Sequence, residues 1–138
     1  MKKIFKKRHK SRKLIIQALY NFEISKNNIN EIENYLLDTI NEKKIDKNYF
    51  HTLIKKIPEK INILDKIIIR YTEKNTYMNI IETAIIRLAT FELLFCLKIP
   101  YKAIINEALE LSKIFCSKSS YTFLNKILDG IAKEIREI

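Results

Sequence analysis

The sequence predicts an all-α fold. It contains a single glycine and only two prolines, whereas sheets and their hairpins need turn residues that adopt positive φ. Its apolar residues recur in long periodic stretches separated by short polar segments, which is the pattern of amphipathic helices. A length of 138 residues, with 47% apolar and 30% charged residues, suits one folded domain over residues 1–138. We therefore expect six or seven helices in one bundle-like domain.

The first helix is expected to run from around Lys7 or Ser11 to about Ser25. Its apolar face is formed by Leu14, Ile15, Ala18, Leu19 and Phe22. A second, mostly basic stripe follows the i, i+4, i+7 spacing of one helix flank. It consists of Lys6, Lys10, Lys13, Gln17 and Tyr20. The basic start of the chain is thus expected to continue along the helix as one polar surface that ends in a tyrosine.

Three further helices are expected over about residues 31–40, 47–57 and 58–71. Asn30 and Asp46 are suited to cap the first two, because their side-chain oxygens can accept bonds from free backbone amides. Pro58 lacks an amide donor and disfavours helix at Ile57, so we expect a break there, with Pro58 in the first turn of the next helix. The expected buried positions are Ile32, Leu36, Ile40, Tyr49, Phe50, Leu53, Ile57, Ile61, Leu64, Ile68 and Tyr71.

Residues 73–76 read as a connection, and residues 78–98 form the longest and most apolar segment. A helix that is apolar around most of its girth must be surrounded by others, so this segment is the expected central helix. Two helices follow over residues 101–115 and 121–135, the second with Ser119 or Ser120 as its N-cap. Their expected core positions are Ile104, Ile105, Ala108, Leu109, Leu111, Phe115, Leu124, Ile127, Leu128, Ile131 and Ile135.

Positive charge is concentrated at the start of the chain. Residues 1–13 hold eight lysines and arginines and no acid, whereas the remaining 125 residues hold 18 basic and 16 acidic residues. A general drift toward lysine, as in an AT-rich genome, would spread along the whole chain. The concentration therefore indicates an anionic partner for the basic segment 1–13.

The sequence offers no catalytic or metal-binding motif. Cys96 and Cys116 form no CxxC pair, and His9 and His51 have no zinc-ligand spacing. The lone Gly130 cannot build a phosphate-binding loop. We expect a binding protein rather than an enzyme, with no cofactor, no metal and no small-molecule substrate. No apolar run is long enough to span a membrane and no signal-peptide cleavage site follows the basic segment, so a cytoplasmic protein is expected.

Two residues on helix flanks have both a functional and a structural interpretation. Phe123 lies about 100 degrees from the centre of the core stripe of the last helix, beside Lys126, where it could stack on an unpaired base. Its alternative role is packing at the edge of the core. Glu82 begins the central helix, where it either meets a partner or serves as a cap that is stabilised by the helix dipole.

Three stretches of the sequence resemble the NusB family of bacterial transcription antitermination factors. They are RKLIIQALYNFEIS, IETAIIRLATFELLFCLKIPYKAIINEALELSKIF and SSYTFLNKILDGIA. The resemblance runs essentially from end to end and implies a NusB-like bundle in two packed helical subdomains. It also implies binding of single-stranded boxA RNA together with the ribosomal protein NusE, within a transcription elongation complex that contains other Nus factors. In the family this complex helps RNA polymerase read through terminators, notably in ribosomal RNA operons.

The resemblance also implies roles for individual residues. The family's basic N-terminal stretch, which contacts RNA, is matched by Lys6, Lys7, Arg8, Lys10, Arg12 and Lys13. A phenylalanine of the last helix is matched by Phe123, and we add its neighbour Lys126 and the stripe residue Gln17 as RNA contacts. The protein-partner contacts map onto Tyr20 of the QALY motif and onto Glu82.

The sequence departs from the family pattern at three positions near the last helix. Cys116 stands where a glycine is usual, Ser119 where an acid is common, and Lys126 in place of the glycine of an FxNGVL pattern. Several family arginines are lysines here, which gives up bidentate phosphate contacts and guanidinium stacking. Lys126 adds a positive charge beside Phe123, so we expect these departures to affect base preference and not to weaken RNA binding.

Two other functions fit an all-helical basic chain. One is an RNA-binding accessory domain like the N-terminal domain of some ribosomal RNA cytosine methyltransferases. Such enzymes continue into a Rossmann-type domain with a glycine-rich loop, which we do not expect here because the sequence has one glycine and stops at Ile138. The other is a structural oligomerisation bundle, which would show no preference for boxA-like RNA.

Overall fold

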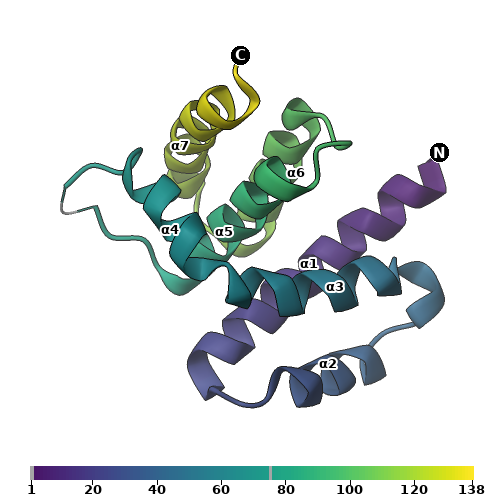
Figure 1. Cartoon of the computed structure of the whole chain (residues 1–138). Helices are drawn as coiled ribbons and strands as arrows, with labels where there is room; N and C mark the ends of the chain where they lie inside the picture. Colours follow the sequence, from purple (N-terminus) through teal and green to yellow (C-terminus); the bar gives the residue numbers. More distant parts are fainter. Residues whose placement is uncertain (1, 75) are drawn as a thin grey trace. The chain divides into compact units, whose positions relative to one another are not determined.

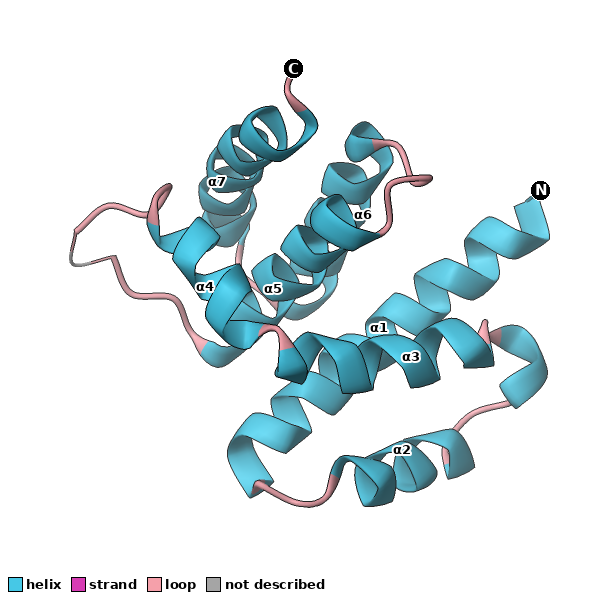
Figure 2. Cartoon of the chain, in the orientation of Figure 1, coloured by secondary structure: helices cyan, strands magenta, loops and turns pink. Residues whose placement is uncertain are grey.

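The structure, a computed structural model, describes residues 2–74 and 76–138. Over these residues helices are joined by loops and turns, with no strand (Figures 1 and 2). The elements are α1 (Lys2–Ser25), α2 (Ile29–Asp38), the 3-10 helix η1 (Glu42–Lys44), α3 (Lys47–Glu59), α4 (Ile61–Ile69), α5 (Ile80–Phe95), α6 (Tyr101–Phe115) and α7 (Lys118–Arg136). The chain divides into two helical units, unit 1 (Met1–Glu59) and unit 2 (Lys60–Ile138). The predicted all-α class is confirmed.

Unit 1 is built on the long helix α1, which packs against α2 and α3. Its buried apolar side chains are Leu14, Ile15, Ile16, Ala18, Leu19, Ile32, Leu36, Ile45, Phe50, Leu53, Ile54 and Ile57. One acid of unit 1 is also buried, which no pattern in the sequence predicts. Glu33 is 7% exposed, with His51 Nδ1 at 2.6 Å from one oxygen and Lys55 Nζ at 3.8 Å from the other. The two partners compensate the loss of hydration of this carboxylate.

Two boundaries of unit 1 differ from the prediction. The helix α1 begins at Lys2, not at Lys7 or Ser11, because no glycine or proline interrupts the lysine-rich start and lysine is a good helix former. The N-cap of α2 is Asn28, not Asn30, and its side chain accepts a bond of 2.7 Å from the Asn30 amide. This helix ends at Asp38, so Ile40 lies beyond it and is half-buried.

At α3 the expected N-cap is confirmed, but the position predicted for Pro58 is wrong. Asp46 accepts a bond of 3.1 Å from the Tyr49 amide, as expected of an N-cap. Pro58 lies inside the last turn of α3 instead of opening the next helix, and the break follows at Lys60. The fixed φ of proline is close to the helical value, so a proline near the end of a helix removes one hydrogen bond without stopping the helix at once.

Unit 2 is organised around α5, which contacts α4, α6 and α7 (Figure 1). Nine of its 16 residues are buried, which confirms that it is the central helix, although it is shorter than the predicted segment 78–98. The predicted connection 73–76 separates α4 from α5 and includes Asn75, which lies outside the described residues. The predicted bounds of α6 are confirmed. The helix α4 buries Leu64, Ile67 and Ile68, whereas Ile61 and Tyr71 are only half-buried.

The helix α7 begins three residues earlier than predicted. Its N-cap is Ser117, not Ser119 or Ser120. Ser120 is instead 4% exposed and donates a bond of 2.6 Å to Glu82 of α5. Near the other end of α7, Arg136 donates to the carbonyls of Leu93 (2.8 Å) and Ile99 (3.1 Å). Leu93 lies in the last turn of α5, where carbonyls lack amide donors within the helix, and Ile99 lies in the connection that follows. The Arg136 guanidinium thus satisfies acceptors of both segments.

The only glycine of the chain permits a close helix contact. A Cβ on Gly130 would lie 2.6 Å from Cδ1 of Tyr71. The Tyr71 hydroxyl donates a bond of 2.6 Å to Glu134, which raises the pKa of the phenol above its ordinary value. Arg70 also pairs with Glu134, at 2.8 Å. The ring of Tyr71 is thereby held against the backbone of α7.

We predict that Gly130→Ala lowers the free energy of unfolding by about 1 kcal/mol. Alanine favours helix by about 1 kcal/mol over glycine, but the clash with the Tyr71 ring costs about 1–3 kcal/mol. In a Tyr71→Ala background the clash is absent, so the same substitution should stabilise the protein. Urea unfolding of the four proteins measures this reversal of sign. A stabilising Gly130→Ala in the presence of Tyr71 would contradict the contact.

We also predict that Thr90→Val stabilises the protein by about 1 kcal/mol. Thr90 lies in the centre of α5 with 0% exposure, and within the described residues its hydroxyl has no hydrogen-bond partner. Valine keeps the shape and removes the unsatisfied group. The matched control is Thr83→Val in the same helix, where the hydroxyl donates to the Asn79 carbonyl at 2.8 Å. Thermal unfolding should show a gain for Thr90→Val and none for Thr83→Val.

Candidate functional site

The basic stripe predicted on α1 is accessible to solvent. Lys6, Lys10, Gln17 and Tyr20 are exposed and Lys13 is half-buried. Lys7, which directly follows the first residue of this stripe, is exposed as well. The helical spacing thus places a row of ammonium groups on one side of α1, followed by an amide and a phenol. The contacts to RNA and to a protein partner that we expect of these residues remain predictions.

The two arginines of the basic segment 1–13 are engaged within unit 1. The guanidinium of Arg8 lies 4.2 Å from the centre of the Tyr49 ring and its Nε is 3.3 Å from Asp46. Arg12 is 4% exposed, with its guanidinium 5.7 Å from the same ring. Both therefore join α1 to the start of α3. These intramolecular contacts could not be predicted from the sequence, because Tyr49 lies far from both arginines along the chain. The RNA contacts expected of Arg8 and Arg12 remain predictions.

A cleft of about 360 Å³ opens in unit 1 beside the basic stripe. One wall is α1, which contributes Lys10, Lys13, Leu14 and Gln17 at i, i+3, i+4 and i+7. The other wall is the segment around η1, which contributes Ile40, Asn41, Lys44 and Ile45. We call this feature the α1–η1 cleft. Lys10, Lys13 and Gln17 of the α1 wall belong to the stripe that helical periodicity predicts. The η1 wall has no periodicity, so the sequence did not indicate it.

The α1–η1 cleft combines an apolar floor with a cationic rim. Leu14 is 4% and Ile45 is 7% exposed, whereas Lys10 and Lys44 are exposed to solvent. Within the described residues, no acidic side chain pairs with Lys10, Lys13 or Lys44. The charges of this cleft are therefore available to an anionic ligand.

The acids nearest to the η1 wall are already paired. Glu42 lies 2.9 Å from Lys47 and Asp46 lies 3.3 Å from Arg8. The wall itself is held by short-range bonds: the Asn41 side chain accepts from the Lys43 amide at 3.1 Å and the Asn41 carbonyl from the Lys44 amide at 2.9 Å. The α1–η1 cleft thus has a fixed wall and an excess of positive charge.

The two predicted RNA contacts of unit 2 lie on α7. Phe123 is half-buried, which is compatible both with stacking and with packing at the edge of the core. Lys126 is 84% exposed and lies 3.9 Å from Glu73, a distance and exposure at which an ion pair contributes little. Because the Lys126 side chain extends into solvent, it meets no neighbour that would require a glycine at this position of α7. Cys116, the other departure from a family glycine, has φ −128, which any residue adopts.

Glu82 serves as a structural cap of α5. Its Oε1 accepts a bond of 3.0 Å from the Asn79 amide while the Asn79 side chain accepts from the Glu82 amide at 2.8 Å. This reciprocal pair is a capping box. Its Oε2 accepts from Ser120 of α7. The cap interpretation is therefore confirmed, while the partner contact predicted for Glu82 and Tyr20 is not tested by these bonds.

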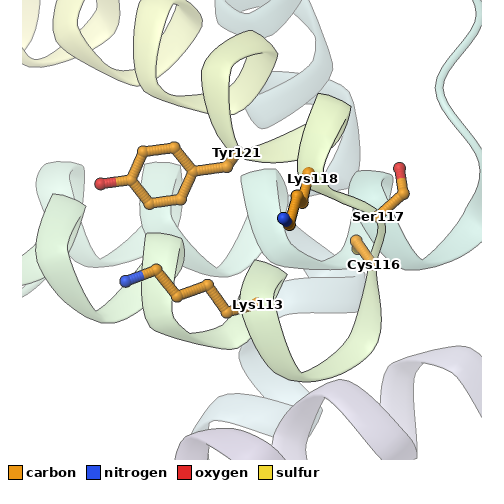
Figure 3. A pocket seen from close by; sticks show the side chains of 5 residues that line it. All are labelled: Lys113, Cys116, Ser117, Lys118 and Tyr121. Atoms are coloured by element: carbon orange, nitrogen blue, oxygen red, sulfur yellow. The ribbon is translucent and has the colours of Figure 1, made fainter.

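A second pocket, of about 480 Å³, lies in unit 2 where α6 turns into α7. It is lined by Lys113, Cys116, Ser117, Lys118 and Tyr121 (Figure 3). The Lys113 ammonium lies 5.3 Å from the centre of the Tyr121 ring, a cation–π distance. Burial raises the pKa of the Cys116 thiol, and the Glu82 carboxylate adds to this effect. The thiol therefore stays protonated at neutral pH and is a poor nucleophile.

Two features of other functional classes are absent from the residues that the structure describes. No group of three or more His, Cys, Asp or Glu side chains in this part of the chain could hold a metal ion. None of the helices described has the length and apolarity needed to cross a membrane.

The sequence matches known proteins over nearly its whole length. The NusB family model matches residues 9–133. The transcription antitermination protein NusB of Buchnera aphidicola subsp. Cinara cedri is 43% identical over 91% of this chain and 89% of its own length. The protein of the same name from Colwellia psychrerythraea is 39% identical over 94% of both chains.

Solved structures show the same fold. The structure of T. maritima NusB superposes with a TM-score of 0.81 and 32% identity, over 95% of this chain and 97% of that chain. A crystal structure of the antitermination factors NusB and NusE in complex with double-stranded RNA gives a TM-score of 0.80 with 19% identity, over 91% and 96% of the two chains. The family model covers most of the chain and the relatives match it almost end to end. The chain therefore belongs to the NusB family.

Proposed function

We propose that the chain is a transcription antitermination factor. It binds boxA-type single-stranded RNA together with the ribosomal protein NusE and, with other Nus factors in the elongation complex, helps RNA polymerase read through terminators, notably in ribosomal RNA operons. The observation that carries this proposal is the family match over residues 9–133, with relatives named transcription antitermination protein NusB. A fold neighbour solved with NusE and RNA supports these two classes of partner.

In the proposed complex the exposed lysines of α1 neutralise the RNA backbone. Lysines 6, 7, 10 and 13 lie along one side of this helix, and ammonium groups contact phosphates with little regard to sequence. Base recognition then falls to Gln17 on α1 and to Phe123 on α7. Both side chains are at least partly accessible, and an unstacked base offers both an edge to the amide and a face to the ring.

The proposed partner contacts are Tyr20 and Glu82. Tyr20 is 41% exposed at the far end of the α1 stripe, so its ring is available to another protein. Glu82 is half-buried in its capping box and would offer its remaining surface. A partner that also binds RNA raises RNA affinity, and by linkage RNA raises partner affinity by the same factor.

The proposed function is binding and not catalysis, and it places the chain in the cytoplasm with the nascent RNA. The two other candidate functions make different predictions. A methyltransferase accessory domain would not require NusE, and an oligomerisation bundle would not distinguish RNA sequences. Labelled boxA RNA and a scrambled strand, each titrated with and without NusE, separate the three. We expect a preference for boxA that NusE increases.

We predict that RNA affinity falls steeply with salt. If about 4 to 6 phosphates are contacted, the slope of log affinity on log salt for a single strand is roughly −3 to −4. The double variant Lys6→Ala/Lys7→Ala should reduce the size of this slope by about 1.4, since each lost contact removes about 0.7. Fluorescence anisotropy at several salt concentrations measures both values.

The matched control for this pair removes the same charge elsewhere. Lys98 and Lys102 are exposed in unit 2 and lie outside both proposed surfaces, so Lys98→Ala/Lys102→Ala should leave the slope nearly unchanged. Equal slopes for the two double variants would mean that net charge, and not the basic segment 1–13, attracts RNA.

We predict that Phe123 and Glu82 act on different partners. Phe123→Asp should weaken RNA binding by about 1–3 kcal/mol, the range for stacking of a base on an aromatic ring, and leave NusE binding unchanged. Glu82→Gln should weaken NusE binding more than RNA binding. Glutamine keeps a side-chain acceptor in the capping box, whereas Glu82→Lys would remove the cap and lower stability as well.

The control for Phe123 is Phe123→Leu. Leucine retains apolar bulk at the edge of the core but has no ring face, so it should weaken RNA binding while the melting temperature stays nearly constant. Unchanged RNA affinity in Phe123→Leu would assign this residue to packing. Equal loss of both partners in Phe123→Asp and Glu82→Gln, with both proteins folded, would contradict the division of surfaces.

A further inference from the structure

We propose that the α1–η1 cleft holds one nucleotide of the bound single strand, with Lys44 as an RNA contact on its second wall. The base lies in the cleft and the flanking phosphates meet the ammonium groups on its rim. This inference rests on the proposed function, because it assumes that α1 binds RNA. It extends the RNA surface from one helix to a separate segment of unit 1.

The shape of the cleft suits a nucleobase. Its volume of about 360 Å³ falls within the range of about 300–1,000 Å³ that is typical of small-molecule sites. The floor is made by Leu14 and Ile45, which are nearly buried, so a planar base can lose hydration against aliphatic carbon. The amides of Gln17 and Asn41 stand on opposite walls of the cleft and offer donors to the edge of a base.

The charge of the cleft selects an anionic ligand. Lys10 and Lys13 stand on one wall and Lys44 on the other, and none of these lysines has an acidic partner in the part of the chain that the structure describes. A strand that enters the cleft carries a phosphate on each side of the inserted base. Ammonium groups on both walls match this arrangement, which a single line of lysines on one helix would not.

The second wall is held in place without the ligand. Ser11 is fully buried in α1, directly after Lys10, and its hydroxyl accepts a bond of 2.8 Å from the Asp46 amide. This bond fixes the chain one residue after Ile45 against α1. The two walls therefore keep their separation before RNA arrives, and binding does not have to order this segment.

The chain contains a matched pair of lysines for the test. Lys43 and Lys44 are adjacent and exposed in η1, but only Lys44 lines the cleft. The proteins Lys44→Ala and Lys43→Ala carry the same net charge. Fluorescein-labelled boxA-type RNA is titrated with wild type and with both variants at several salt concentrations, and circular dichroism verifies that all three proteins melt alike.

We expect Lys44→Ala to weaken binding by at least about threefold and to reduce the size of the salt slope by about 0.7, the value of one phosphate contact. Lys43→Ala should change affinity by less than about twofold, since long-range attraction is screened by salt. Equal effects of the two variants, while the wild type binds RNA, overturn the inference and leave the proposed function intact. A wild type that does not bind boxA RNA overturns both.

A second measurement tests the inserted base. Abasic nucleotides are placed one position at a time along the same RNA. We expect one position at which removal of the base weakens wild-type binding but has a smaller effect on Gln17→Ala, because both changes remove the same contact. The absence of any such position overturns the base-in-cleft arrangement. Loss of NusE binding in Lys44→Ala with unchanged RNA affinity also overturns it and assigns the cleft to a protein.

Discussion

The architecture of unit 1 depends on the junction between Ser11 and Asp46. The buried Ser11 hydroxyl accepts the Asp46 amide at 2.8 Å and lies 3.1 Å from the Asp46 carbonyl. The carboxylate of the same residue accepts from the Tyr49 amide and pairs with Arg8. One short residue on α1 thus determines where α3 begins, where Tyr49 meets the two arginines, and where the segment around η1 runs. A larger side chain at position 11 would displace all three.

The α-helices could be predicted from the sequence, but several of their N-caps could not. Apolar periodicity identified every α-helix but not the 3-10 helix η1. The helix α5 was recognisable as the central one because apolar residues occur around most of its circumference. The predicted N-caps were wrong where several possible capping residues lie close together, as in Asn27, Asn28 and Asn30 or in Ser117, Ser119 and Ser120. Local propensity is similar at each of these positions, so a tertiary contact decides. The bond from Ser120 to Glu82 is such a contact, and it cannot be read from neighbouring residues.

In the candidate site, too, the features that depend on neighbouring residues could be predicted, whereas those that depend on distant residues could not. The lysine stripe of α1 follows from helical spacing and is exposed as expected. The engagement of Arg8 and Arg12 by Tyr49, and the position of Lys44 opposite Lys10, depend on how α1 meets a segment that is distant in the sequence. A surface that seemed to belong to one helix is therefore shared by two segments, and only part of its positive charge faces the solvent.

The arginines and the lysines of this chain make different kinds of contact. All five of its arginines make contacts that use a planar guanidinium: Arg8 and Arg12 with an aromatic ring, Arg70 and Arg87 with carboxylates, and Arg136 with carbonyls. The proposed RNA surface is left to lysines, which are strongly hydrated point charges with no preferred plane. Such a surface attracts any polyanion and does not fix the position of the bound strand along it. The discrimination of one RNA from another must then come from a small number of uncharged side chains. A change at one of them would remove the preference for one sequence, while the attraction between the lysines and any RNA backbone would remain.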